Sequence, residues 1–207
     1  MGCSRTGHPV TTGRARARSI LRHIMRVPRT FAFVDLSGFT NYTAAYGDDA
    51  AGRILSAFRS IAREIASERG VRIAKWLGDG CMIVAVEQKD AVIFALELDR
   101  RAAQVCAPLA IRVGLASGYA LIFEGDDYIG SAVNMAARLC DIAGPFEILV
   151  PAMQLERLPE GVVATDHGAL QLRGFPGTIE VLALSGDPVA APRNDTGELW
   201  TRLPFGG

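Results

Sequence analysis

Hydrophobic residues recur along this chain with two spacings, one helical and one typical of strands. Between Asp48 and Gly70 the helical spacing predicts an amphipathic helix that Asp48 or Asp49 can cap and that ends at the glycine. Its apolar positions are Ile54, Leu55, Phe58, Ile61 and Ile65. Two further helices are expected, over residues 90–105 and from residue 131 to the Gly144-Pro145 stop.

Short apolar runs between these helices predict strands. They are residues 31–34, 71–77, 81–86, 111–116, 119–123, 147–150, 170–174 and 178–184. Gly78-Asp79-Gly80 predicts a tight hairpin with Asp79 at its tip. The order strand, helix, two strands, helix, strand is typical of an α+β fold, a ferredoxin-like antiparallel sheet with helices on one face and added closing strands.

Length and composition favour one well-buried domain with modest extensions. The 207 residues are 49% hydrophobic, and we expect a leader over residues 1–28, a domain over residues 29–185 and a flexible tail over residues 186–207. The first thirty residues contain seven arginines and no acidic residue, so the rest of the chain is mildly acidic. A nucleic-acid-binding body would show a basic face, and we therefore expect no nucleic-acid partner for the domain.

The leader has two open interpretations. Residues 14–26 could form a basic amphipathic helix that contacts an anionic membrane or a partner, or they could be an unstructured arginine-rich leader. No run approaches the ~18 apolar residues of a membrane span, and no signal peptide precedes the domain, so a cytoplasmic location is expected. The four cysteines lack paired spacing and are interpreted as reduced core residues.

The first predicted strand leads into a carboxylate, Asp35. An unpaired charge beside a buried strand costs several kcal/mol, so we expect a positive partner against it. The alternative is that Asp35 caps the helix that follows. The bend Ser37-Gly38-Phe39-Thr40 opens that helix, and its free N–H groups suit a phosphate.

Asp79 is expected to lie near Asp35, because the first strand and the first hairpin are neighbours in such a sheet. One or two aspartates together with substrate phosphates are the usual ligands of magnesium. The alternative is that both are capping or turn aspartates.

Asn134 and Arg138 share one face of the third helix. An arginine there could offset charge that develops during phosphoryl transfer; the alternative is a solvated surface arginine.

Three stretches carry a resemblance to a known family. FVDLSGFT (33–40), KWLGDG (75–80) and DYIGSAVNMAAR (127–138) resemble the signature stretches of class III nucleotidyl cyclases, the adenylate and guanylate cyclase catalytic domain. The resemblance extends over residues 29–185. All three stretches occur in order, which is far more specific than any one of them alone.

The resemblance implies roles for individual residues. Asp35 and Asp79, with the carbonyl of Leu36, would hold two divalent cations, Mg or Mn. Lys75 and Asp127 would bind adenine, and Asn134 and Arg138 would orient the ribose and stabilise the transition state. The remaining substrate-binding positions would be Gly38, Phe39, Thr40 and Arg173, the last at a position where the family more often has lysine.

The hydrogen-bonding groups of adenine also favour ATP as the substrate. Adenine offers an acceptor at N1 and donors at its exocyclic amine, which an ammonium and a carboxylate can pair, whereas guanine reverses this pattern. Lys75 and Asp127 therefore favour ATP.

The sequence indicates no catalytic histidine. Asp35 is open to interpretation as a proton acceptor or as a metal ligand alone.

The resemblance also implies a head-to-tail homodimer whose two sites take the metal aspartates from one subunit and the other residues from its partner. The leading hypothesis is an adenylate cyclase that converts ATP to cyclic AMP and pyrophosphate. A guanylate cyclase and a non-catalytic nucleotide-binding or dimerisation module are the alternatives. A diguanylate cyclase is disfavoured, because KWLGDG lacks the Gly-Gly-acidic-acidic-Phe hairpin.

Overall fold

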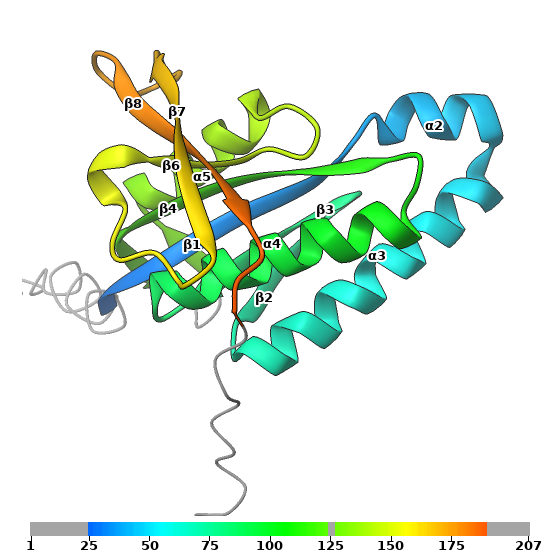
Figure 1. Cartoon of the computed structure of the whole chain (residues 1–207), viewed down its shortest axis with the longest axis horizontal. Helices are drawn as coiled ribbons and strands as arrows, with labels where there is room; N and C mark the ends of the chain where they lie inside the picture. The colour runs from blue at the N-terminus through cyan, green and yellow to red at the C-terminus, as the bar shows by residue number, and fades with distance from the viewer. Residues whose placement is uncertain (1–24, 124–126, 190–207) are drawn as a thin grey trace, which may run out of the picture.

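A single mixed sheet forms the centre of the computed structural model, which describes residues 25–123 and 127–189 (Figure 1). The strands follow the order β2-β3-β1-β4-β6-β8-β7, with β5 paired to β4. All the paired neighbours are antiparallel except β4 and β6. The strands are β1 (Met25–Ser37), β2 (Arg72–Leu77), β3 (Gly80–Ala85), β4 (Ala110–Phe123), β5 (Asp127–Ile129), β6 (Ile148–Pro151), β7 (Val162–Leu170) and β8 (Ile179–Gly186). The expected α+β class is confirmed.

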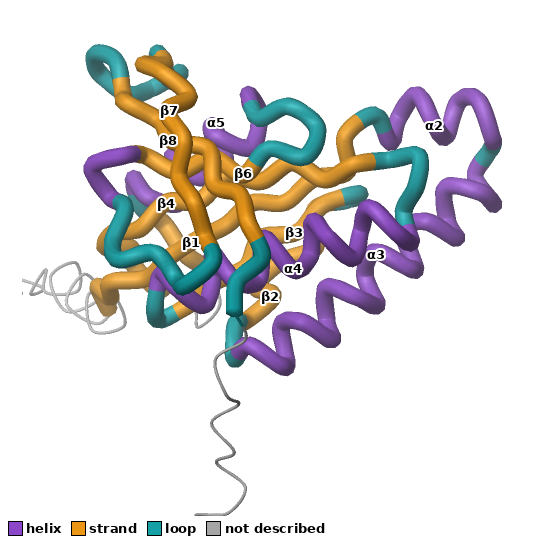
Figure 2. The backbone as a smooth tube through the Cα atoms, in the orientation of Figure 1, coloured by secondary structure: helices purple, strands orange, loops and turns teal. Residues whose placement is uncertain are grey.

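The helices divide between the two faces of this sheet. They are α2 (Phe39–Tyr46), α3 (Asp48–Arg69), α4 (Gln88–Val105) and α5 (Ser131–Ile142), with a 3₁₀ turn η2 (Ala152–Gln154). Helices α3 and α4 lie side by side on one face (Figure 2). The expectation that all helices share this face does not hold for α5, which packs against the opposite face. Gly114 makes this packing possible, since a Cβ there would lie 2.2 Å from the carbonyl oxygen of Ala136.

Helix α3 follows the predicted apolar pattern, but its N-terminal cap is Gly47 and not Asp48 or Asp49, whose side chains make no capping hydrogen bond. Ile54, Phe58, Ile61 and Ile65 are buried, because a helical spacing of apolar residues places them on one stripe that faces the sheet. The helix ends at Gly70, which has the left-handed φ of +65° that a C-terminal cap requires. Its two leading aspartates lie in the first turn, where negative charge complements the helix dipole.

The alternation of side chains along β1 decides which face carries the candidate site. Ala32, Val34 and Leu36 belong to the core beneath α3 and α4. Phe31 lies in the second core, beneath α5. Because successive strand residues point to opposite faces, Asp35 lies on the α5 face.

Two strand predictions differ from the structure. The pattern predicts separate strands over residues 111–116 and 119–123, but β4 is continuous because Ser117 and Gly118 pair with Thr30 and Arg29 of β1. The predicted strand over residues 170–174 is wrong. The partner of β8 is instead β7, which ends at Leu170, and turns follow it.

The described chain begins inside the expected leader. Strand β1 starts at Met25, and the segment Met25–Pro28 pairs with β4, so an ordered strand is present before residue 29. The rest of the leader, Cys3 within it and most of the tail lie outside the described residues. Among the helices that the structure describes, none is long and apolar enough to cross a membrane.

Three cysteines are buried free thiols, as expected for core residues. Burial is the largest cause of their raised pKa values, which reach about 11 for Cys106 and about 12 for Cys81 and Cys140. Their thiols therefore stay protonated at neutral pH and contribute to packing.

Candidate active site

The structure brings Asp35 and Asp79 together at one end of β1. Asp35 pairs with Gly80 across the β1–β3 ladder, and Asp79 directly precedes Gly80 in the hairpin turn. A Cβ at position 80 would lie 2.2 Å from the carbonyl oxygen of Val34. Glycine is therefore needed for the close approach that places the Asp79 turn beside Asp35.

Asp79 is held in an environment that disfavours its charge. Burial is the largest cause of its raised pKa, and the neighbouring charge of Asp35 raises the pKa further. Its own backbone N–H and the Arg112 guanidinium oppose this effect. Two carboxylates in such a setting would gain from a cation placed between them.

Arg112 is the positive partner that the burial of Asp35 calls for, and our sequence reasoning missed it. It lies opposite Asp35 in the β1–β4 pairing. Its Nε donates to Asp35 Oδ2 at 2.9 Å, and its Nη2 donates to the same oxygen. Gly38 serves as the N-terminal cap of α2, so the structure does not support Asp35 as a helix cap. The one signal in the sequence was a charged residue inside the apolar run 111–116.

A pocket of about 360 Å³ opens at this point, and we call it the Asp35 pocket. It is lined by residues of β1, β2, β3, β4 and α5: Phe33, Val34, Asp35, Leu77, Gly80, Arg112, Ala137, Arg138, Cys140 and Asp141. Arg112, Arg138, Asp35 and Asp141 thus line one small pocket. Such a lining suits a charged, phosphate-bearing ligand bound together with cations.

Arg138 reaches the wall of the Asp35 pocket within a single chain. Its Nη1 donates to Asp141 Oδ2 at 3.0 Å, and the main-chain oxygen of Asp141 accepts from Arg112 Nη1 at 3.1 Å. Asp141 therefore tethers both arginines. Asn134 lies one turn earlier on the exposed side of α5 and does not line the pocket.

Lys75 and Asp127 form an ion pair between β2 and β5. Their side chains remain 45% and 50% exposed, so a ligand could reach both. The pair joins two stretches that are 52 residues apart in sequence. Neither residue lines the Asp35 pocket in the same chain.

The remaining predicted positions lie at separate places. Gly38 has a φ of +81° and begins α2, with Phe39 and Thr40 in the first turn. The side chain of Leu36 is buried, so only its main chain is suited to bind a ligand. Arg173 is exposed in the turns between β7 and β8 and does not line the Asp35 pocket.

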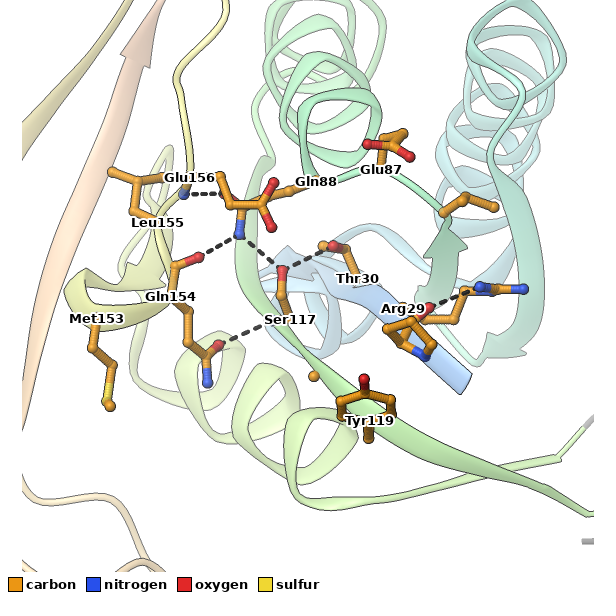
Figure 3. A pocket seen from close by; sticks show the side chains of 13 residues that line it. Arg29, Thr30, Glu87, Gln88, Ser117, Tyr119, Met153, Gln154, Leu155 and Glu156 are labelled. Atoms are coloured by element: carbon orange, nitrogen blue, oxygen red, sulfur yellow. Dashed lines mark hydrogen bonds between the residues drawn. The ribbon is translucent and has the colours of Figure 1, made fainter. Parts of the chain in front are cut away.

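A second cavity, of about 400 Å³, lies at the opposite end of β1 (Figure 3). We call it the Gln88 pocket. Gln88 donates to Ser117 Oγ and to the carbonyl oxygen of Gln154, each at 2.8 Å, and accepts from Glu156 N at 2.7 Å. Thr30 and Ser117 share a further hydrogen bond of 2.8 Å. These buried groups bond to one another, so they do not indicate a ligand site, although three charged residues, Arg29, Glu87 and Glu156, also line this pocket.

The donors near Asp35 fit a divalent cation of the magnesium type. No group of three or more His, Cys, Asp or Glu side chains converges in the described ranges, so the protein alone offers no closed metal cage there. Two aspartates and one main-chain carbonyl are hard oxygen ligands, which Mg²⁺ and Mn²⁺ accept when substrate phosphates complete the shell.

The family model of the adenylate and guanylate cyclase catalytic domain matches residues 27–186. The chain belongs to this family, the class III nucleotidyl cyclases. An uncharacterized protein of Mycobacterium tuberculosis is 35% identical over 158 residues, which are 76% of this chain and 41% of the relative. An adenylate cyclase of Streptomyces coelicolor is 33% identical over 126 residues, 61% of this chain and 33% of the relative. The chain thus spans about two fifths or less of the length of these relatives.

Solved structures agree on the fold. The adenylyl cyclase CyaB from P. aeruginosa matches with a TM-score of 0.65 at 23% identity, over 82% of this chain and 97% of that one. The catalytic core of a rhodopsin-guanylyl cyclase with converted specificity, in complex with ATPalphaS, matches with a TM-score of 0.69 at 20% identity, over 79% and 98%. The guanylyl cyclase Cya2 also matches, with a TM-score of 0.67 at 19% identity over 83% of this chain and 98% of that one, so the fold alone does not choose the substrate.

Proposed function

We propose that this domain is an adenylate cyclase that converts ATP to 3′,5′-cyclic AMP and pyrophosphate. The observation that carries the proposal is the convergence of Asp35 and Asp79 beside a pocket walled by Arg112 and Arg138. Carboxylates for cations and guanidinium groups for phosphate oxygens are what phosphoryl transfer requires of a protein.

In this proposal the residues of the Asp35 pocket, together with the adjoining Asp79 turn and the Leu36 main chain, bind and orient a triphosphate. Asp35, Asp79 and the Leu36 carbonyl would hold two divalent cations, which would neutralise the triphosphate and lower the pKa of the ribose 3′-hydroxyl. The 3′-hydroxyl gives up its proton, to the Asp35 carboxylate or to solvent, and its oxygen forms a bond to the α-phosphorus. The bond from that phosphorus to the pyrophosphate oxygen breaks, and pyrophosphate leaves. Arg112 stabilises the negative charge that develops during this exchange, together with Arg138 of the same chain or, in a shared site, the partner subunit's Arg138.

The base-binding pair supports ATP rather than GTP. The Lys75 ammonium and the Asp127 carboxylate lie together on an exposed part of β2 and β5, where they match the acceptor and donor of adenine. Turnover of ATP should therefore exceed that of GTP. Lys75→Ala should reduce the ratio of kcat/KM for ATP to that for GTP by about tenfold, because a charged hydrogen bond is lost to one base only. A preference for GTP in the wild-type protein would establish the guanylate cyclase alternative.

The first experiment is a direct assay. The purified chain, incubated with Mn²⁺ or Mg²⁺ and ATP, should release cyclic AMP and pyrophosphate in equal amounts. Activity per molecule should fall on dilution if a dimer is required. Tight nucleotide binding without a cyclic product from ATP or GTP would favour the non-catalytic module instead.

We further propose that two copies form a head-to-tail homodimer with shared sites. Tyr119, Phe123 and Ile129 are exposed apolar side chains on β4 and β5, around the strand that carries Asp127. A partner that covered them would bury apolar surface and would bring its own Asp35 pocket toward the base-binding pair.

A complementation assay tests the sharing of sites. Asp35→Ala and Arg138→Ala should each be inactive alone. Mixed in equal amounts, they should recover about a quarter of wild-type activity, because half the dimers would be mixed and each would hold one intact site. Arg138 already borders the Asp35 pocket of its own chain, so a site completed within one chain predicts no recovery. Absence of recovery in demonstrated heterodimers would overturn the shared arrangement.

A further inference from the structure

A second arginine contacts the hairpin turn that carries Asp79. Arg59 lies on α3, and its Nη2 donates to the carbonyl oxygen of Gly78 at 2.8 Å. Its guanidinium carbon lies 5.0 Å from the centroid of the Trp76 ring. The Nε atom is buried and has no hydrogen-bond partner among the described residues, so the ring and the Gly78 carbonyl are the contacts that orient this side chain.

Trp76, which Arg59 contacts, is itself packed against the core. Its ring packs edge-on against Phe58, with the centroids 6.3 Å apart, and belongs to the border of the core beneath α3. Strand alternation places Trp76 on the α3 face and Lys75 on the opposite face. Arg59 therefore reaches the hairpin turn from the side of the sheet that faces away from the Asp35 pocket.

The Gly78 carbonyl belongs to the peptide unit that leads into Asp79, so a bond to it restrains that residue. Leu77 and Gly80 close the hairpin, so Gly78 and Asp79 are the two residues of the turn. Gly78 has a φ of +68°, which favours glycine at this position. The carbonyl of Gly78 and the N–H of Asp79 belong to one planar peptide unit. A hydrogen bond to that carbonyl therefore fixes the plane from which the Asp79 side chain projects.

Arg63 provides an internal comparison. It lies one helical turn after Arg59, and its guanidinium carbon is also 5.0 Å from the Trp76 centroid. Within the described ranges, Arg59 alone of these two donates a hydrogen bond to the turn. The two arginines thus share the cation–π contact and differ in the bond to Gly78.

We propose that Arg59 is a positioning residue for Asp79: it fixes the Gly78–Asp79 peptide so that the carboxylate is preorganised to bind a divalent cation together with Asp35. This inference rests on the proposed cyclase function of the site. Groups that orient metal ligands from outside the ligand shell typically change metal affinity or activity by about 10–100-fold when they are removed.

The test measures binding of Mn²⁺ to the full chain by electron paramagnetic resonance, in the presence of 3′-deoxy-ATP, which lacks the attacking hydroxyl. Arg59→Gln should raise the Kd for Mn²⁺ by about tenfold. Arg63→Gln should change it by less than about twofold, since the bond to Gly78 is retained. Asp79→Ala serves as the reference for loss of the site. In the activity assay, Arg59→Gln should raise the Mn²⁺ concentration for half-activation and leave the KM for ATP at saturating Mn²⁺ unchanged.

The outcomes separate this inference from the proposed function. Wild-type Mn²⁺ affinity in Arg59→Gln, or equal loss in Arg63→Gln, would overturn the role of Arg59. Binding of Mn²⁺ by a wild-type protein that makes no cyclic nucleotide would reject the function and leave the role of Arg59 to be judged on binding alone. Absence of Mn²⁺ binding in the wild-type chain would overturn both. If Arg59→Gln does not fold, Arg59→Met replaces it, because methionine keeps an unbranched stem against Trp76 and removes the donor.

Discussion

The two ends of β1 carry opposite kinds of polar structure. At the Gln88 pocket, the buried polar side chains are neutral and bond to one another: Gln88 is 5% exposed and Thr30 is 3% exposed, and both are bonded. The charged residues of its lining, Arg29, Glu87 and Glu156, are less buried than these. At the Asp35 pocket, charged side chains meet, and the pKa of Asp79 is raised because burial and Asp35 both oppose its charge.

This difference separates a stabilising network from a binding site. A buried neutral network with every group paired contributes to stability and has nothing left to offer a ligand. A cluster of partly compensated charges is costly to the free protein and gains from a ligand of the right charge. We therefore propose the Asp35 pocket as the site of the reaction, although the Gln88 pocket is slightly larger.

The largest effect is expected at the charged end. Asp79→Asn keeps the size of the side chain but removes a carboxylate from the proposed cation site, so cyclase activity should fall by at least about 100-fold. The free energy of unfolding should not decrease, because a disfavoured charge is removed. Enzyme assays and urea unfolding measure the two quantities. Asp49→Asn, at an exposed position in the first turn of α3, is the matched control: it should keep wild-type activity and lower the free energy of unfolding by less than about 1 kcal/mol, through the helix dipole alone.

At the neutral end the expected effect is on stability. Gln88→Leu would leave the N–H of Glu156 and the carbonyl of Gln154 without their present partner, and should lower the free energy of unfolding by about 2 kcal/mol. Activity per folded molecule should stay within about twofold of wild type. Gln104→Leu, at an exposed position of the same helix, controls for the change of residue type. A tenfold loss of activity in Gln88→Leu would contradict our division of the two ends.

Arg112→Lys asks how specific the charge arrangement is. A lysine cannot reproduce the two bonds to Asp35 Oδ2 together with the bond to the Asp141 carbonyl, so kcat/KM should fall by about tenfold. Arg101→Lys is the control, since Arg101 forms a surface ion pair with Glu64. Equal activities in the two variants would show that Arg112 acts only as a counter-charge.

The smallest effect concerns the dependence of stability on pH in metal-free buffer. The pKa of Asp79 is raised above its ordinary value of 3.8, so the folded state binds this proton more tightly than the unfolded state does. The corresponding stabilisation is full below about pH 3.8 and is lost as the pH rises through the folded value. The wild type should therefore lose free energy of unfolding relative to Asp79→Asn as the pH rises above 4. A constant difference from pH 3 to pH 7 would contradict the raised pKa.

Much of the fold was predictable from local pattern. Helix α3 has the expected apolar face and glycine stop, and the hairpin at Asp79 was predicted from Gly-Asp-Gly between two apolar runs. Such features depend on residues only a few positions apart, whose spacing alone decides which face they occupy. The break placed in β4 and the strand placed at residues 170–174 failed because pairing with β1 and β8, not local composition, decided where those strands run.

The candidate site divides in the same way. The sequence by itself determined the family, and it proposed Asp35, Asp79, Lys75 and Asp127 as site residues, because these residues lie in three recognisable stretches. Only the tertiary structure decided that Arg112 neutralises Asp35, that Arg59 holds the Asp79 turn and that α5 covers the opposite face from α3. The physical reason is that cross-strand register and helix packing join residues that are tens of positions apart, and no local spacing encodes those partners.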